Sequence, residues 1–331
     1  MPNRSEPTSK SALLIAHRGA SGLRPEHTLA GYELAARMGA DYLEPDLVST
    51  ADGVLVARHE PEIGETTDVA ERPEFADRHT TKIIDGQPYT GWFVEDLTLA
   101  ELKSLRATER LPLLRQRNTI YDRRFEVPTF DEILALRDRL SVELGREIGV
   151  YPETKHPTYF ASLGSPLEPA LVDALSRAGL NRPDAPVFVQ SFETANLVQL
   201  RAVLEVPLVQ LLEAEGAPAD FVADGDPRSY ADAIGPEKSQ VIARDPDGAL
   251  AEPTALVAEA HAAGLQVHAY TFRNENHFLP ANLRSGPAES DYGDSFAEYA
   301  AFLAAGLDGL FTDNTDTASL ARAAHANGIG G

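Results

Sequence analysis

The sequence contains no cysteine among its 331 residues. Disulfides and thiolate metal sites are therefore excluded, and a bound metal would need oxygen or nitrogen ligands.

The sequence also lacks a long apolar run. No stretch approaches the roughly 20 residues of a membrane-spanning helix. The first apolar stretch, 12–16, is too short for the core of a signal peptide. We therefore expect a cytoplasmic protein without stable membrane association, or an exported one if a leader has been removed.

Basic residues are scarce: 29 Lys and Arg stand against 51 Asp and Glu, for a net charge of −22. Such a chain should repel nucleic acid and anionic membranes. An anionic small-molecule substrate would need local positive charge or a metal at its site. The basic residues comprise five lysines and 24 arginines, so a lysine beside acidic residues, such as Lys155, favours a specific role.

The most informative segment runs from His17 to His59. It begins with a strand that ends in His17-Arg18-Gly19, followed by a strand that carries Glu44 and Asp46. Two carboxylates at positions i and i+2 of a strand point to one face, where both can bind one cation. An arginine can bind phosphate with two hydrogen bonds, and two histidines can supply a general acid and a general base. The segment therefore suits metal-assisted phosphoryl chemistry.

A hairpin returns the second histidine to this group. Asp52-Gly53 is a favoured pair for a two-residue turn. With these residues at the turn centre, Ala51 faces Val54 and Asp46 lies opposite His59. A slip of register would change this pairing.

Apolar strand-like runs alternate with helical patterns along the chain, which predicts an α/β fold with a parallel sheet. One run, 54–59, is the hairpin return, and the remaining eight match the number of strands in a TIM (β/α)8 barrel. The expected strands are 12–17, 42–48, 54–59, 148–153, 187–192, 207–213, 240–244, 266–272 and 309–312. The expected helices are 27–38, 98–106, 130–143, 167–178, 193–203, 252–263, 296–305 and 315–325.

Two segments break the alternation. Residues 61–127 are rich in Thr, Asp, Arg and Pro, and 273–294 separates the last two strands. We expect one catalytic barrel domain spanning 1–331, with 61–127 as an inserted subdomain over the barrel mouth. Trp92 and Phe93 would either shape the alcohol side of the pocket or form the core of the insertion itself.

Further polar residues fall at the ends of expected strands, where such barrels carry their active sites. Glu153 and Lys155 end one strand, Gln190 ends the next, and His268 and Tyr270 share a later one. Glu153 with Lys155 could also be a structural ion pair. Gln190, His268 and Tyr270 could equally line the barrel interior. The remaining histidines other than His27 give no signal of their own.

These residues together resemble the glycerophosphodiester phosphodiesterase family, over nearly the whole chain. The YPETK, HAYTFRNEN and GLDGLFTDN segments are most similar to its long, periplasmic-type branch. The matching residues are His17-Arg18-Gly19, Pro25-Glu26-His27-Thr28, Gly39-Ala40-Asp41-Tyr42-Leu43-Glu44, Asp46, Thr50, Asp52-Gly53, His59, Glu153, Lys155 and Gln190-Ser191-Phe192.

The resemblance implies a TIM barrel that hydrolyses glycerophosphodiesters to sn-glycerol 3-phosphate and an alcohol with one divalent cation, Mg²⁺ or Ca²⁺. It assigns His17 and His59 as the acid–base pair. The implied metal ligands are Glu44, Asp46 and Glu153, and the implied substrate-binding residues are Arg18, Lys155, Gln190 and Tyr270.

Two residues depart from the family pattern. Many members have Asn where this chain has His27, and Asp where it has Glu60. The second departure could change how His59 is oriented.

Other functions remain open at this stage. Lys155 could form a Schiff base in a lyase, although the neighbouring carboxylates disfavour this. A lysophospholipase D or a non-catalytic barrel would share the fold. The sequence leaves open the head group, the choice of metal, the oligomeric state, and whether water or the glycerol 2-hydroxyl is the nucleophile.

Overall fold

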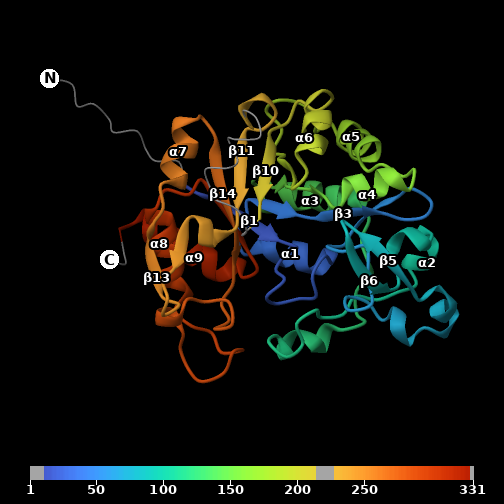
Figure 1. The fold of residues 1–331 in the computed structure, drawn as a ribbon, viewed down its shortest axis with the longest axis horizontal. Coiled ribbons are helices and arrows are strands. Elements are labelled where there is room, and N and C mark those ends of the chain that lie inside the picture. Colours follow the sequence, from blue (N-terminus) through green and yellow to red (C-terminus); the bar gives the residue numbers. More distant parts are fainter. Residues whose placement is uncertain (1–10, 214–226, 329–331) are drawn as a thin grey trace.

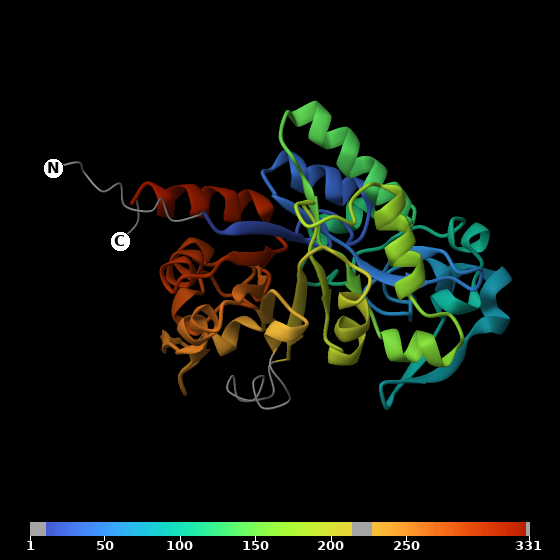
Figure 2. The ribbon, with the colours of Figure 1, turned by 90° about the horizontal axis from the view of Figure 1, so that it is seen from above.

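The computed structural model describes residues 11–213 and 227–328, which form a closed α/β barrel with helices outside (Figures 1 and 2). Within this part of the chain, eight parallel strands pair in a ring that closes between β15 and β1. The predicted TIM barrel is confirmed. Its strands are β1 (Leu13–His17), β2 with β3 (Tyr42–Glu44 and Asp46–Ser49), β7 with β8 (Gly149–Val150 and Glu153–Thr154), β9 (Val189–Ser191), β10 (Leu208–Leu212), β11 (Ala233–Pro236), β14 (Gln266–Phe272) and β15 (Gly309–Thr312).

Proline interrupts two of these barrel strands. Pro45 separates β2 from β3, and Pro152 lies between β7 and β8. Proline has no amide hydrogen, so it breaks the ladder for one residue. Each proline carbonyl still accepts from the next strand, from Glu153 N and Gln190 N respectively, and the ring remains closed.

One predicted barrel strand is wrong. Residues 240–244 were expected to belong to the barrel, but Ile242–Arg244 (β12) forms a separate antiparallel hairpin with Leu250–Pro253 (β13). The barrel strand is β11, whose sequence AIGP contains residues disfavoured in strands. A Cβ at Gly235 would lie 2.6 Å from a Leu211 side-chain carbon, so glycine is needed there for packing.

The helices follow the predicted positions, and a short helix, α4, was missed after the third strand. Threonine side chains cap two N-termini: Thr28 accepts from Gly31 N, and Thr129 forms a capping box with Glu132. The helices are α1 (Leu29–Arg37), α2 (Leu99–Leu102), α3 (Phe130–Leu144), α4 (Pro157–Ser162), α5 (Glu168–Arg177), α6 (Thr194–Arg201), α7 (Leu256–Ala262), α8 (Ser295–Ala304) and α9 (Thr315–Ala326). In the described ranges, no helix combines the length and apolarity needed to cross a membrane.

The hairpin after β3 differs from the prediction by one residue. Its return strand, β4 (Leu55–Ala57), pairs Ser49 with Leu55, so the loop between Thr50 and Val54 has three residues. Gly53 adopts φ +80°, the left-handed conformation that such a loop requires. Arg58 N therefore donates to the Asp46 carbonyl, and His59 lies one residue beyond the predicted pairing.

The two excursions lie on the same side of the barrel, below the sheet in Figure 1. Residues 61–127 contain the hairpin β5 (Thr80–Ile84) and β6 (Gln87–Gly91), α2 and several short 3₁₀ turns. Arg115 of this segment pairs with Glu275 of the second excursion at 2.7 Å, so the two segments meet.

The barrel interior is packed with aromatic and aliphatic side chains. Tyr151 stacks on Phe188 and meets Phe311 edge-on. His268 is fully buried beside them, and its Nδ1 lies 2.8 Å from the Tyr151 hydroxyl. The alternative of His268 as a barrel-lining residue is therefore correct.

The place of His268 generates a stability prediction. A Cβ at Gly309 would lie 2.7 Å from His268 Cδ2. We expect Gly309→Ala to destabilise the protein by about 1–3 kcal/mol through overpacking, measured by urea unfolding. The same change in a His268→Ala background should cost much less. Equal losses in both backgrounds would show that the close contact is not the cause.

Candidate active site

The strand register places five polar residues in one row at the carboxyl ends of adjacent strands. His17 of β1 pairs with Glu44 of β2. Asp46 of β3 pairs with Glu153 of β8, which pairs with Gln190 of β9. The parallel register alone thus brings together side chains that lie up to 173 residues apart in the sequence.

Three carboxylates form the centre of this row. Glu44, Asp46 and Glu153 are each at most 5% exposed, and one oxygen from each lies within 4.8 Å of the others. Burial and the neighbouring carboxylates raise the pKa of Glu44 well above its usual value. Burial likewise raises the pKa of Glu153 to about 8, although Lys155 opposes the shift.

Asp46 keeps its negative charge in this cluster. Burial opposes its ionisation, but the hydrogen bond from His27 and the charge of Arg18 hold its pKa well below the usual value. His27 Nε2 lies 3.0 Å from Asp46 Oδ2, and its Nδ1 lies 2.7 Å from the Tyr32 hydroxyl. His27, which stands where many family members have Asn, therefore holds Asp46 in position.

Arg18 lies beside the three carboxylates. Its amide donates to Glu44 Oε2 at 2.8 Å, and its Nε lies 3.3 Å from Asp46 Oδ2. Arg18 has φ +58°, a left-handed conformation that is strained for a residue with a Cβ. Such strain is common where a side chain is aimed at a functional site.

His17 is held by Asp313. Its Nδ1 lies 2.6 Å from Asp313 Oδ1. The carboxylate must accept, so the proton lies on Nδ1 and Nε2 is left as an acceptor. Burial, followed by the charge of Arg18, lowers the pKa of His17 to about 4.

Two arginines hold the other oxygen of Asp313. Arg115 Nη2 donates to Oδ2 at 2.6 Å and Arg273 Nε at 2.8 Å. Burial opposes ionisation, but Arg273, Arg115 and His17 hold the pKa of Asp313 well below its usual value. The sequence analysis missed Asp313. Its place directly after the last strand, where such barrels carry active-site residues, would have identified it.

His59 has a similar arrangement. Its Nδ1 pairs with Glu60, and its Nε2 lies 3.3 Å from Lys155 Nζ. The ammonium can only donate, so Nε2 accepts and the proton again lies on Nδ1. Burial, with Arg18 and Lys155, lowers the pKa of His59 to about 3. Glu60 therefore performs the orienting contact despite its departure from the family pattern.

Lys155 is a cation in this site. Its Nζ lies 3.0 Å from Glu153 Oε1, and only 8% of the side chain is exposed. Burial opposes its charge, but Glu153 and Asp46 raise the pKa above the usual value. A Schiff base needs a neutral amine, so the lyase alternative is disfavoured.

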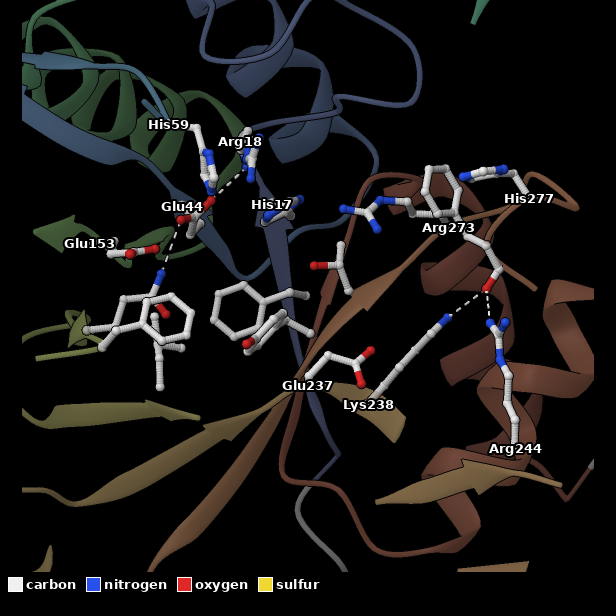
Figure 3. Close-up of a pocket in the computed structure, with 17 residues that line it drawn as sticks. His17, Arg18, Glu44, His59, Glu153, Glu237, Lys238, Arg244, Arg273 and His277 are labelled. Carbon is white, nitrogen blue, oxygen red and sulfur yellow. Dashed lines mark hydrogen bonds between the residues drawn. The ribbon is translucent and has the colours of Figure 1, made fainter. Parts of the chain in front are cut away.

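A cavity of about 360 Å³ opens beside this row, with the catalytic candidates at one end and a second group of basic residues at the other (Figure 3). Gln190 and Tyr270 both line it. Gln190 Nε2 donates to Glu44 Oε1 at 3.1 Å, whereas the Tyr270 hydroxyl donates to the Leu212 carbonyl. The lining residues are His17, Arg18, Glu44, His59, Glu153, Gln190, Phe192, Leu211, Glu237, Lys238, Arg244, Tyr270, Thr271, Arg273, His277, Phe278 and Phe311.

The aromatic pair of the insertion does not line this cavity. Phe93 is 1% exposed, and Trp92 Nε1 donates to the Phe75 carbonyl at 2.7 Å. Trp92 also packs on the apolar cluster that the insertion shares with the barrel. The structure therefore favours the alternative that the pair forms the core of the insertion and contradicts the one that places it in the pocket wall. His277, which gave no signal in the sequence, does line the cavity.

Comparison with known proteins agrees with this geometry. The model of the "Glycerophosphoryl diester phosphodiesterase family" matches residues 17–317. A curated glycerophosphodiester phosphodiesterase from Arabidopsis thaliana is 35% identical, over 91% of this chain and 83% of that protein. One from Haemophilus influenzae is 29% identical, over 92% of this chain and 88% of that protein.

Solved structures share the fold. A putative glycerophosphoryl diester phosphodiesterase from Silicibacter pomeroyi has a TM-score of 0.65 at 22% identity, covering 98% of this chain and 96% of that one. A phosphodiesterase from Oleispira antarctica, in complex with the product sn-glycerol-3-phosphate, has a TM-score of 0.63 at 22% identity, covering 93% and 96%.

The histidine contacts predict specific tautomers. His17 and His59 should carry the proton on Nδ1, whereas His261, whose Nε2 lies 2.7 Å from Asp308, should carry it on Nε2. Imidazole ¹⁵N shifts at pH 7.5, assigned with single His→Gln variants, check this.

Asp313→Asn should change the His17 pattern and leave the His261 pattern unchanged, because only His17 loses its carboxylate acceptor. An unchanged His17 signal in Asp313→Asn would contradict the orienting role of Asp313.

Proposed function

The chain belongs to the glycerophosphoryl diester phosphodiesterase family, and from this we propose that it hydrolyses glycerophosphodiesters with a divalent cation and two histidines. The products would be sn-glycerol 3-phosphate and an alcohol. One observation carries the proposal: the three buried carboxylates lie within 4.8 Å of one another, beside a cavity lined by His17, His59 and Arg18.

The carboxylate cluster suits a hard divalent cation. Glu44, Asp46 and Glu153 offer only oxygen, the donor that Mg²⁺ and Ca²⁺ prefer. Without a bound cation, the raised pKa values of Glu44 and Glu153 favour their protonated forms, which reduces the repulsion among the three carboxylates. We propose that these three residues hold Mg²⁺ or Ca²⁺. When bound, the cation would supply Lewis-acid stabilisation of the charge on the phosphate oxygens.

Positive side chains flank the cluster, as an anionic diester requires in so acidic a protein. Arg18 and Lys155 would bind the phosphate oxygens and stabilise the charge that develops as the ester bond breaks. Gln190 and Tyr270, both lining the cavity, would contact the substrate beside them. With a net charge of −22, we expect a small-molecule substrate and not a nucleic acid.

The two histidines suit proton transfer. Each has its Nδ1 on a carboxylate, which leaves Nε2 for the reaction. With pKa values lowered below 6.5, both are neutral at pH 7 in the protein alone and can accept a proton. One would take the proton of the nucleophile, water or the glycerol 2-hydroxyl, on its Nε2. The other would first take up a proton from solvent on its Nε2 and then give it to the leaving alkoxide.

We also propose that 61–127 is an inserted subdomain at the barrel mouth. Two arginines support this. Arg110 pairs with Glu26 at 2.7 Å and with Glu60 at 2.5 Å, and Arg115 pairs with Asp313. The insertion would then act by fixing the carboxylates that orient both histidines rather than by lining the pocket.

Metal binding should stabilise the fold, independently of activity. Mg²⁺ or Ca²⁺ should raise the melting temperature in a concentration-dependent manner, since the cation binds only the folded cluster. Protons compete with the metal at groups of raised pKa such as Glu153, so the apparent affinity should rise as the pH rises from 6 to 8.5 and weaken as it falls. Differential scanning fluorimetry measures both effects.

A matched buried glutamate provides the control. Glu153→Gln should abolish the metal-induced shift. Glu109→Gln changes a residue that is 6% exposed, whose pKa burial also raises, to about 7, but which lies outside the cluster; it should retain the shift. A metal shift that persists in Glu153→Gln would exclude this cluster as the site.

The acid–base assignment predicts a defined loss of rate. His17→Ala and His59→Ala should each lower kcat by roughly 10²- to 10⁴-fold with the fold intact, measured on glycerophosphoglycerol. Because the two act in one reaction, the double variant should lose far less than the product of the single losses. Wild-type turnover in either single variant would remove that histidine from the mechanism.

A further inference from the structure

The far end of the cavity has a second concentration of positive charge. Beyond the carboxylate cluster, Lys238, Arg244 and Arg273 line the cavity, together with His277 and a single carboxylate, Glu237 (Figure 3). Acidic residues outnumber basic ones by 51 to 29 in this chain. The side chains that line this end of the cavity therefore include more basic than acidic groups, the opposite of the chain as a whole.

Lys238 is held in place by a buried partner behind it. Its Nζ lies 2.7 Å from Glu298 Oε1, and the two side chains are 10% and 1% exposed. Glu298 does not line this cavity, although it borders the smaller one next to it. Of this ion pair, only Lys238 therefore faces the cavity, whereas Glu298 lies behind it.

Arg244 approaches the same point without an acidic partner of its own. Its Nη2 donates to the Phe278 carbonyl at 2.6 Å, and Lys238 Nζ lies 3.5 Å from the same oxygen, so two cations converge on one carbonyl (Figure 3). Among the described residues, no carboxylate lies within ion-pair distance of Arg244. Burial lowers the pKa of Lys238, Glu298 opposes this shift, and the charges of Arg273 and Arg244 add to it.

Arg273 extends the basic surface toward the catalytic residues. Only its Nε is occupied by Asp313, and its guanidinium lies between His17 and the far end in Figure 3. The Nη groups form no hydrogen bond to the described residues. They are therefore available to an oxyanion that enters the cavity.

Among the described residues, Arg244 has no carboxylate partner and the Nη groups of Arg273 are unbonded, so an anion bound between these side chains would be stabilised by them. We propose that this end of the cavity, lined by Lys238, Arg244 and Arg273, binds a phosphate or carboxylate carried by the alcohol half of the substrate. This inference rests on the proposed diesterase function and narrows it. The preferred substrates are glycerophosphodiesters whose leaving alcohol is itself acidic, and Glu237 accepts a hydrogen bond from a hydroxyl of that alcohol.

The test compares kcat/KM on diesters that differ in the charge of the alcohol. Glycerophosphoglycerol has a neutral alcohol and glycerophosphocholine has a cationic one. The two anionic substrates are glycerophosphodiesters whose leaving alcohol is glycerol phosphate or glycerate. We expect wild-type protein to favour the anionic alcohols over the neutral one by roughly 10-fold or more. The two anionic substrates distinguish a phosphate from a carboxylate preference.

Variants at Arg244 link any preference to this end of the cavity. Arg244→Gln should reduce the ratio of anionic to neutral kcat/KM toward one, and Arg244→Glu should shift preference toward glycerophosphocholine. Arg139→Gln, which removes an exposed arginine of α3, should keep the wild-type ratio. Arg244 is exposed on a surface hairpin, so these variants should fold.

Wild-type hydrolysis of glycerophosphoglycerol tests the diesterase function separately. If this substrate is hydrolysed but the anionic diesters are no better, the anionic subsite is refuted and the diesterase function stands. An anionic preference that survives in Arg244→Glu would also refute the subsite. If wild-type protein with added Mg²⁺ or Ca²⁺ hydrolyses none of the diesters, the proposed function itself is refuted.

Discussion

The mutual repulsion of three buried carboxylates is the constraint around which the mouth of this barrel is built. Glu44, Asp46 and Glu153 reach one point because three strand segments pair in register. Removing such charges from water is costly unless neighbouring groups compensate. Arg18 and Lys155 supply opposite charge on two sides of the cluster. Burial and these two cations lower the pKa of His59, and burial and Arg18 lower that of His17. The side chains that balance the carboxylate charge thus also favour the neutral form of the histidines.

Asp313, which follows β15, is a further buried carboxylate whose charge is balanced by basic neighbours. It is the carboxylate partner of His17 and accepts from two arginines that arrive from separate excursions. A neutral acid could donate to His17 Nδ1 and so favour the other tautomer of the histidine. The two arginines keep Asp313 ionised. Each excursion therefore contributes to the orientation of His17 through its arginine.

The sequence predicted the parts of the site that local pattern determines. Alternation of strands and helices gave the barrel, and strand-end positions gave the histidines and the carboxylates. It failed where tertiary packing overrides local preference: β11 contains Gly235 because Leu211 occupies the space of a Cβ. The hairpin register slipped because a three-residue loop replaced a two-residue turn. The far basic end of the cavity could not be foreseen, since Arg244 arrives from a hairpin and Lys238 from a short 3₁₀ turn.

The bridge made by Arg115 has a consequence for motion. Arg115 is buried and pairs at once with Asp313 and Glu275, residues 198 and 160 positions away in the sequence. Swinging either excursion outward would leave an uncompensated charge in the interior, at a cost of about 3–5 kcal/mol. Opening of the mouth by that route is a rare event at equilibrium. Substrate therefore reaches the cavity while the two excursions, as the structure describes them, stay joined through Arg115.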